Sequence, residues 1–354
     1  MKLSVPFIPD TGYAKILAQK KTDLASVYFC LHSGPMLDAR VQSTPVDPSL
    51  FVKTLGRLTG IKAYCLLNSR FVRPDLYLDD LFLSQTLDTL QKLHETIGLQ
   101  GIVFSDLYLI HALSRTGHGL ISHLEAVPGI NMMTDTAPKA FFLLDAIRKT
   151  GFRLPGKLVL DRSLNRDFHG LERTVRGIRQ AYPRMGIELM ANEGCLLHCP
   201  FKLTHDAQIS LSNTGLVQEQ THRISHTLGC HDTFFHHPHL FLSAPFIRPE
   251  DMHAYAGLAD TIKISGRTLG PKFLDKVLSA YTQGSFDGNL LELMDATGFL
   301  ADTYYIDNKK LGPDFLDTLA NCDKFCQKCR ICRELFAHAA RKQPITMKPY
   351  KDTQ

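Results

Sequence analysis

"IKAYCLLN" (61–68), "LSQTLDTLQKLHETIG" (83–98) and "GIVFSD" (101–106) follow one another along the chain and decide its fold. The first and third are short, almost continuous apolar runs, which are typical of strands buried on both faces of a parallel sheet. In the second, leucines recur at spacings of three and four residues and Gly98 ends the pattern, as in an amphipathic helix. The segment therefore predicts a strand–helix–strand unit.

The same alternation of short apolar runs and amphipathic stretches extends over most of the chain. An amphipathic helix is predicted at 171–186. Further strands are predicted at 2–8, 26–31, 130–134, 157–161, 187–192, 239–246 and 261–266. About eight repeats favour an α/β protein with a TIM-like (β/α)8 barrel. An open doubly wound sheet is the alternative, but no glycine-rich phosphate loop follows the first strand.

The pattern changes near residue 291. The sequence predicts one helix over 290–305 and a second over 314–342, with four cysteines inside the second. We therefore expect a barrel domain at 1–290 and a C-terminal helical, cysteine-rich extension at 291–354. Its last residues, from 342, are expected to form a tail.

The composition is that of a soluble globular protein. Hydrophobic residues make up 44% and charged residues 21% of the 354 residues. No apolar run approaches the length of about eighteen residues that suggests a membrane span, and the N-terminus lacks the features of a signal peptide. We therefore expect a cytoplasmic protein. A net charge of +5 is compatible with an anionic substrate or with RNA.

Seven of the nine cysteines fall into two groups, and clustered thiols in a reducing compartment indicate metal or redox chemistry. The first group is Cys195, Cys199 and Cys230. Cys195 and Cys199 follow a predicted strand, in the loop "EGCLLHCP", so they are expected at the mouth of the barrel. Three thiolates with a fourth ligand suit a 4Fe–4S cluster, and zinc is the alternative.

The second group is the C-terminal run Cys322, Cys326, Cys329 and Cys332. Similar runs in ferredoxins supply three ligands to one cluster and a fourth to another. The run therefore either holds its own cluster or contributes a thiol to the first group, so we expect one cluster or two. A structural zinc knot and the triad spacing of radical enzymes that use S-adenosylmethionine are alternatives.

The loop after 187–192 also admits a nucleophile. Cys195 or Cys199 beside His198, with Glu193 as orienting carboxylate, imitates the arrangement of a hydrolase. Glu193, His198 and His205 are therefore the candidate catalytic residues. A nucleophile needs only one thiol, so the grouping of thiols favours a metal.

Three stretches resemble the collagenase-like peptidases, the family filed as U thirty-two. They are "SAPFIRPEDMHAY" (243–255), "DTIKISGRTLGPKFLDKVLSAY" (260–281) and "ASVYFCLHSGPMLDARVQ" (25–42). The resemblance runs from about residue 3 to 290 and implies a TIM-like barrel. Its UbiU- and UbiV-like members carry a 4Fe–4S cluster and serve oxygen-independent hydroxylation in ubiquinone synthesis, while others hydroxylate an RNA base. This chain departs from them in the close spacing of "NEGCLLHCP" and in its C-terminal cysteine run.

Four residues at predicted strand ends are candidates for substrate binding: Arg40, Asn68, Lys263 and Arg267. The three cations are expected to anchor a carboxylate or phosphate. Alternatively, Arg267 forms a structural bridge with Asp251 or Glu250.

The sequence thus predicts an iron–sulfur protein for oxygen-independent hydroxylation of a small aromatic molecule or an RNA base. A cysteine- or metal-dependent peptidase is one alternative. The other is a non-catalytic subunit that pairs with a second barrel subunit.

Overall fold

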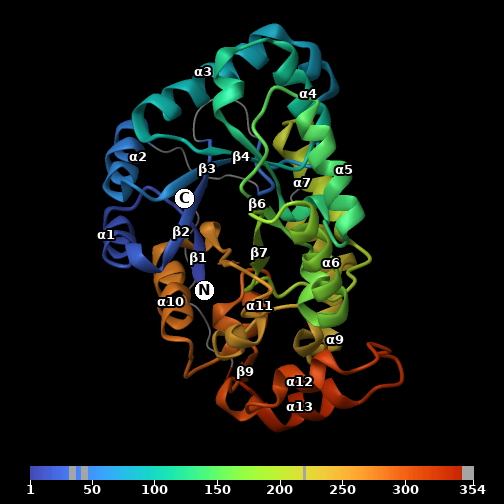
Figure 1. The fold of residues 1–354 in the computed structure, drawn as a ribbon. Helices are drawn as coiled ribbons and strands as arrows, with labels where there is room; N and C mark the ends of the chain where they lie inside the picture. Colours follow the sequence, from blue (N-terminus) through green and yellow to red (C-terminus); the bar gives the residue numbers. More distant parts are fainter. Residues whose placement is uncertain (32–36, 41–46, 218–220, 345–354) are drawn as a thin grey trace.

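Eight parallel strands form the centre of the protein, in the order β5-β4-β3-β2-β1-β8-β7-β6 (Figure 1). The computed structural model describes residues 1–31, 37–40, 47–217 and 221–344. The strands are β1 (Lys2–Pro6), β2 (Leu24–Cys30), β3 (Lys62–Leu67), β4 (Gly101–Phe104), β5 (Glu125–Pro128), β6 (Lys157–Val159), β7 (Gly186–Met190) and β8 (Thr261–Lys263). A parallel bridge between Glu125, the first residue of β5, and Arg153, four residues before β6, brings the two ends of this order together, so the sheet curves into a nearly closed barrel. The predicted TIM-like (β/α)8 barrel is confirmed.

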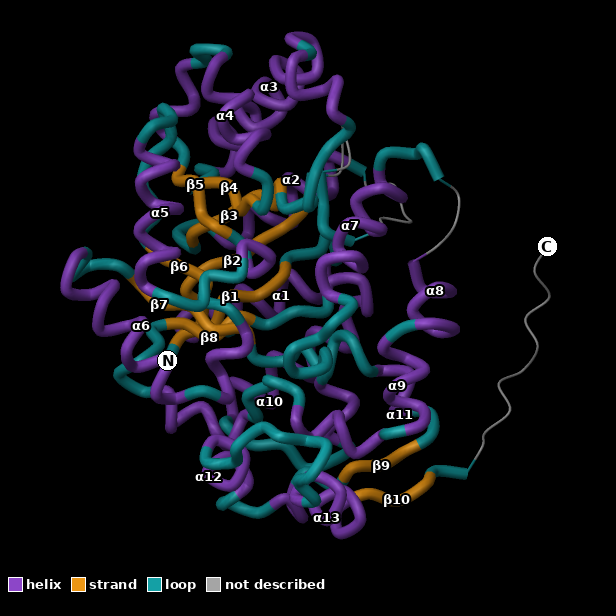
Figure 2. The backbone as a smooth tube through the Cα atoms, turned by 90° about the vertical axis from the view of Figure 1, so that its right-hand side faces the viewer, coloured by secondary structure: helices purple, strands orange, loops and turns teal. Residues whose placement is uncertain are grey.

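Helices connect the strands and lie outside the sheet (Figure 2). In the barrel they are α1 (Thr11–Gln19), α2 (Pro48–Leu55), α3 (Asp80–Ile97), α4 (Leu107–Arg115), α5 (Ala137–Arg148), α6 (Phe168–Ala181), α7 (Lys202–Asn213), α8 (Thr221–Leu228), α9 (Cys230–His236) and α10 (Gly270–Gln283). No helix in the described ranges is long and apolar enough to cross a membrane.

Helix α3 shows how the sequence fixes these elements. The Asp79 side chain accepts a hydrogen bond from the backbone N–H of Phe82 at 3.0 Å, which satisfies a donor that has no partner within the helix. Gly98 ends the helix in the left-handed conformation, with φ of 68°. Leu87 and Leu90 are fully buried between these ends. The amphipathic pattern of the sequence is thus the face that packs on the barrel.

Two of the predicted strands are wrong. The fifth strand is Glu125–Pro128, and the predicted strand at 130–134 is instead a 3-10 turn over Ile130–Met132. Pro128 and Gly129 end the strand just before this apolar run. The segment predicted as a strand at 239–246 begins as a 3-10 helix over Pro238–Ser243, because Pro238 starts the turn and buried Phe241 and Leu242 anchor it.

The region after residue 290 is only partly helical and lies at one end of the molecule (Figure 1, orange to red). Its elements are α11 (Gly298–Ala301), β9 (Tyr304–Ile306), α12 (Phe315–Ala320), α13 (Ile331–Ala339) and β10 (Ala340–Lys342), and β9 and β10 form an antiparallel pair. The predicted helix at 290–305 is wrong because the Asn289 side chain bonds the backbone of Tyr304 and Ile306, which are extended.

The predicted helix at 314–342 is broken between α12 and α13, over 321–330. Leu300, Phe315 and Leu319 belong to the same hydrophobic cluster as the helices and strands of the barrel. The extension therefore packs onto the barrel rather than around a separate core. Of the predicted tail, residues 345–354 lie outside the described part of the chain.

The barrel interior is divided into an apolar and a polar half. Side chains of Tyr64, Leu66, Val103 and Val127, among others, form a small cluster inside the barrel. The polar half centres on Glu188, whose carboxylate is fully buried in β7 and binds two lysines. Burial of a carboxylate is costly unless it is paired, so this half of the interior is held by charge pairing.

Candidate functional site

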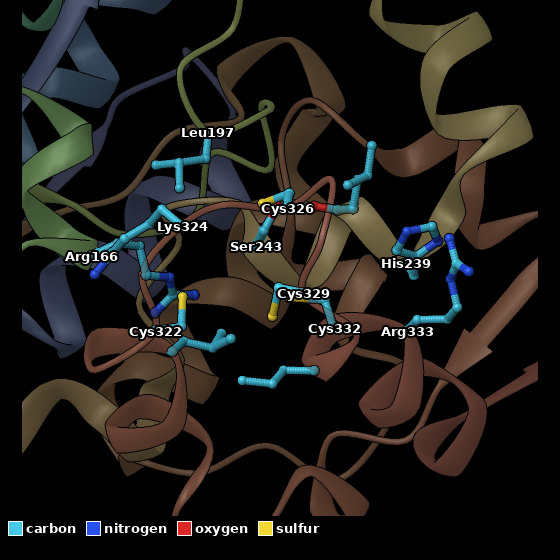
Figure 3. Close-up of a pocket in the computed structure, with 13 residues that line it drawn as sticks. Arg166, Leu197, His239, Ser243, Cys322, Lys324, Cys326, Cys329, Cys332 and Arg333 are labelled. Carbon is cyan, nitrogen blue, oxygen red and sulfur yellow. Dashed lines mark hydrogen bonds between the residues drawn. The ribbon is translucent and has the colours of Figure 1, made fainter.

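The four C-terminal cysteines line one cavity (Figure 3). They lie in the break between α12 and α13 and in the first turn of α13. Loop residue Leu197, from the segment after β7, forms another part of the wall. The structure therefore brings Cys322, Cys326, Cys329 and Cys332 together, and does not leave one of them pointing to a distant site.

The break in the helix is what allows this convergence. Lys324 adopts the left-handed conformation with φ of 59°, which a continuous helix excludes. Asp323 then accepts from the backbone N–H of Phe325 at 2.9 Å, and the N–H groups of Lys328 and Cys329 turn back to Phe325 O. In a continuous helix, these spacings would place the four thiols on one face but spread them over about 15 Å along the axis. The turn brings them around one cavity.

A buried arginine faces the cysteines. Arg166 lines the same cavity, is only 2% exposed, and places its guanidinium beside the rings of Phe246 and Phe315, 4.9 and 5.7 Å from their centroids. Its Nε donates to Ala244 O at 3.1 Å, but neither Nη1 nor Nη2 has a hydrogen-bond partner among the described residues. Burial lowers the pKa of Arg166, with smaller opposing contributions that include the Cys332 thiol.

Two unpaired N–H-bearing nitrogens on a buried cation are costly, because each lost hydrogen bond to water costs about 1–3 kcal/mol. Such a group indicates an anionic ligand in the cavity. Four thiolates around iron and sulfide are anionic and accept hydrogen bonds at sulfur. The residues present therefore fit a 4Fe–4S cluster with four cysteine ligands.

The thiols surround a cavity rather than meet at a point. Within the described residues, no three His, Cys, Asp or Glu side chains are arranged to hold a single metal ion. Around one zinc ion each sulfur lies about 2.3 Å from the metal. In a cluster, each cysteine binds a different iron, so the sulfurs lie farther apart. Burial and the neighbouring thiols raise the pKa of Cys332 to about 12, so metal binding must displace its proton.

The first cysteine group is arranged differently. Cys195 and Cys199 line a pocket beside the loop after β7, whereas Cys230 begins α9 and packs, like Cys199, against the hydrophobic core. The Cys199 and Cys230 thiols are close enough to influence each other, and burial raises the pKa of all three. A second metal centre at these residues stays a prediction.

All four predicted substrate-binding residues line one pocket at the carboxyl ends of the strands. Arg40 pairs with Asp295 at 2.7 Å, and Arg267 pairs with Asp38. Asn68 accepts from the backbone N–H of Ala39 at 3.1 Å. We call this pocket the barrel mouth.

Lys263 points inward, as predicted. Its Nζ lies 3.4 Å from Glu188 Oε1 and 3.8 Å from the centre of the Tyr28 ring. Burial lowers the pKa of Lys263 to about 8. Lys202, also in the mouth, pairs with Asp206, and burial likewise lowers its pKa to about 8.

The alternative bridge from Arg267 to Asp251 or Glu250 is wrong. Arg248 binds Asp251 through two hydrogen bonds of 2.7 Å, and Glu250 accepts from the N–H of Phe286. Arg248 and Asp251 are both buried, so "IRPED" forms a structural pair away from the mouth.

The candidate catalytic residues do not form one constellation. Glu193 lines the mouth and pairs with Arg162, while His198 is exposed and lines the pocket beside Cys195 and Cys199. His205 Nδ1 lies 3.4 Å from Ser225 Oγ. The three residues therefore face different surroundings.

Arg162 and Arg166 connect the two sites. They begin and end a single 3-10 helix, Arg162–Arg166, which follows β6. Arg162 binds Glu193 of the mouth, and Arg166 lines the cysteine cavity. Four steps along such a helix span about 8 Å. The cysteine cavity and the barrel mouth are thus joined by one short, buried segment.

Sequence reasoning missed Arg166, Glu188, Lys202 and Asp295. Glu188 carried a usable signal, because it is a carboxylate inside the apolar run "IELM", and such a residue needs a buried partner. Arg166 carried a weaker one, its place after a predicted strand. Lys202 and Asp295 reach the mouth only through the fold.

No protein-family model matches the chain. An uncharacterized protease of Methanocaldococcus jannaschii is 29% identical over 247 residues, which are 70% of this chain and 68% of that protein. A solved structure described as a U32 peptidase matches with 15% identity and a TM-score of 0.43, covering 62% of this chain and 80% of that one. The chain is similar to the U32 peptidases. An orotidine 5'-monophosphate decarboxylase from Sulfolobus solfataricus matches with 12% identity and a TM-score of 0.30, over 54% of this chain and 77% of that one.

Proposed function

We propose that the chain is an iron–sulfur protein whose 4Fe–4S cluster is held by Cys322, Cys326, Cys329 and Cys332. The observation that carries this proposal is Arg166, a buried cation with two unpaired nitrogens in the wall of the cavity that the four thiols line. An anion in that cavity would satisfy both nitrogens and offset the burial of the charge.

The bound cluster would supply one-electron transfer. The residues of the chain have distinct tasks around it. Arg166 stabilises negative charge on the sulfur ligands, and the rings of Phe246 and Phe315 keep water from its guanidinium. Hydrogen bonds and nearby charge of this kind set the potential of such centres.

The barrel mouth would bind the substrate. Arg40, Lys202, Lys263 and Arg267 bring positive charge, and Tyr28, Leu66, Val103 and Ile130 supply an apolar wall. This combination suits an aromatic molecule with a carboxylate or phosphate, or an RNA base with its phosphate. Because each of these cations has a carboxylate partner, the substrate anion would share them with Asp38, Asp206, Glu188 and Asp295.

The reaction class remains the oxygen-independent hydroxylation implied by the resemblance. In overall balance, an aromatic C–H and one water give C–OH, two protons and two electrons. A cluster near the mouth would carry these two electrons one at a time to an external electron acceptor, which would be reduced in the reaction. The short helix Arg162–Arg166, which reaches from the cysteine cavity to a partner of the mouth, supports this combination.

Metal analysis under nitrogen tests the proposal. Protein purified without oxygen should contain about four iron and four sulfide per chain and absorb in the visible range. Cys329→Ala should lose most iron and sulfide, whereas the matched variant Cys195→Ala should keep them. A colourless protein with about one zinc and no sulfide would overturn the proposal. Loss of iron in Cys195→Ala alone would move the cluster to the first cysteine group.

A peptidase is the second candidate, because the Methanocaldococcus jannaschii relative is called a protease. Burial raises the pKa of Cys195 and Cys199, whereas a nucleophilic thiol needs a lowered pKa. These raised pKa values argue against Cys195 or Cys199 as the nucleophile. Hydrolysis of a peptide library by the wild type, abolished in Cys199→Ala with unchanged metal content, would establish the peptidase instead.

The third candidate, a non-catalytic subunit that pairs with a second barrel, stays a prediction. Copurification of a homologous barrel chain from the native source would favour it. Substrate turnover by the isolated chain would exclude it.

A further inference from the structure

A second pocket opens at the opposite end of the barrel, where the strands begin. Four lysines line it: Lys2, Lys21, Lys62 and Lys157. Hydroxyl groups of Thr22, Ser26, Tyr64 and Thr261 also line it, together with the backbone of Gly60, Gly156 and Gly186. We call it the lysine pocket. TIM-barrel active sites lie at the carboxyl ends of the strands, so this pocket is separate from the barrel mouth.

The fold brings the lysines together from distant parts of the sequence. Lys2, Lys62 and Lys157 are the first residues of β1, β3 and β6, and Lys21 lies just before β2. Parallel strands begin at the same edge, so all four side chains meet at one rim. Gly186 pairs with Lys157 at this rim. A Cβ at position 186 would come within 3.3 Å of Gly156 O, so a larger residue there would crowd the rim.

The charge of the pocket is unbalanced. No acidic side chain is among its described lining residues. Lys157 does form an ion pair: its Nζ lies 2.6 Å from Oε2 of Glu188, inside the barrel. Lys21 donates to Thr59 O at 2.5 Å, and Lys2 and Lys62 form no ion pair within the described ranges. Ammonium groups around one space repel one another, so an anion between the lysines would relieve this repulsion.

We propose that the lysine pocket binds a phosphate-bearing ligand. Several ammonium groups around one space match an anion with more than one charge, and lysine binds phosphate as a point charge with three donors. The hydroxyl of Thr22 can donate to a further phosphate oxygen. The phosphates belong either to a small molecule, such as a nucleotide, or to the backbone of RNA.

The pocket is linked to the barrel mouth through one residue. Glu188 binds Lys157 of the lysine pocket with one carboxylate oxygen and Lys263 of the mouth with the other. The two sites therefore share a buried charge, although they open at opposite ends of the barrel. The binding proposal itself does not depend on the cluster or on the reaction at the mouth.

Calorimetric titration with pyrophosphate at low salt tests the proposal. The test variant is the double substitution Lys2→Gln and Lys62→Gln. Both side chains are exposed and unpaired within the described residues, so the fold should be retained. The matched control replaces two exposed lysines elsewhere, Lys53→Gln and Lys272→Gln, and therefore changes the net charge equally. We expect saturable binding that weakens at least tenfold in the test variant and less than twofold in the control.

The source of the phosphate follows from competition. Displacement of pyrophosphate by a short single-stranded RNA, with a salt slope that falls by about 1.4 in the test variant, would assign the pocket to RNA. Displacement by ADP but not by RNA would assign it to a nucleotide. Either outcome supports the proposal. Absence of saturable pyrophosphate binding, or equal weakening in both double variants, would overturn it.

Discussion

Replacing Arg166 by methionine separates the effect of the cluster from that of the fold. In the cluster-free protein, the substitution removes two unpaired nitrogens, which cost about 1–3 kcal/mol each. It also removes the contacts of the guanidinium with Phe246 and Phe315, about 1 kcal/mol each, and one hydrogen bond to Ala244 of about 1 kcal/mol. These effects nearly offset, so the free energy of unfolding should change by less than about 2 kcal/mol.

With the cluster bound, the same substitution should be much more costly. Arg166 would then donate two charge-assisted hydrogen bonds, worth about 1.5–3 kcal/mol each. Arg166→Met should therefore release iron to a chelator at least a hundredfold faster, since about 3 kcal/mol corresponds to that factor. Its reduction potential should fall, because loss of a cation and of donors to sulfur disfavours the more negative, reduced cluster.

The assay combines chelator-driven iron release with a redox titration under nitrogen. Arg166→Lys keeps the charge with fewer fixed donors, so it should restore part of the potential. Arg333→Met is the matched control: Arg333 lines the same cavity but is exposed, and solvent screens its charge. The reasoning fails if Arg166→Met and Arg333→Met release iron equally fast and at the same potential.

Three further predictions concern the barrel. Burial lowers the pKa of Lys263 to about 8, so between about pH 8 and 10 the unfolded chain binds more protons than the folded one. The free energy of unfolding should therefore rise by about 2–3 kcal/mol over this pH range. Lys263→Met should flatten this rise in a series of denaturant titrations at different pH. Gly194→Ala should destabilise the protein by about 1–3 kcal/mol in urea unfolding, because its Cβ would lie 2.5 Å from Thr297 Oγ1, and an unchanged midpoint would contradict that packing. Arg248→Met should cost about 3–5 kcal/mol, since it leaves Asp251 buried without a partner, and the double variant with Asp251→Leu should recover much of the loss.

The barrel could be predicted from the sequence because its strands are buried on both faces and read as short apolar runs. The runs at 130–134 and 239–246 misled the prediction, since buried 3-10 turns have the same apolar composition as short strands. Pro128 and Pro238 were the local signals that distinguish them.

The candidate sites could be predicted only in part. Residues at strand ends, such as Arg40 and Lys263, were found because parallel strands end at a common mouth. The carboxylate partner of Arg40, Asp295, comes from a loop, and that of Lys263 is Glu188 in β7. Spacing along the chain does not encode such pairings. The convergence of the four cysteines around one cavity depends on the left-handed turn at Lys324, and a lysine carries no sequence signal for that conformation.

Anomalous X-ray scattering at the iron edge, from crystals grown without oxygen, tests the central claim most directly. The account predicts iron between the sulfurs of Cys322, Cys326, Cys329 and Cys332, with the Arg166 guanidinium facing it. Iron bound only at Cys195, Cys199 and Cys230, or a single zinc in place of iron, would contradict it.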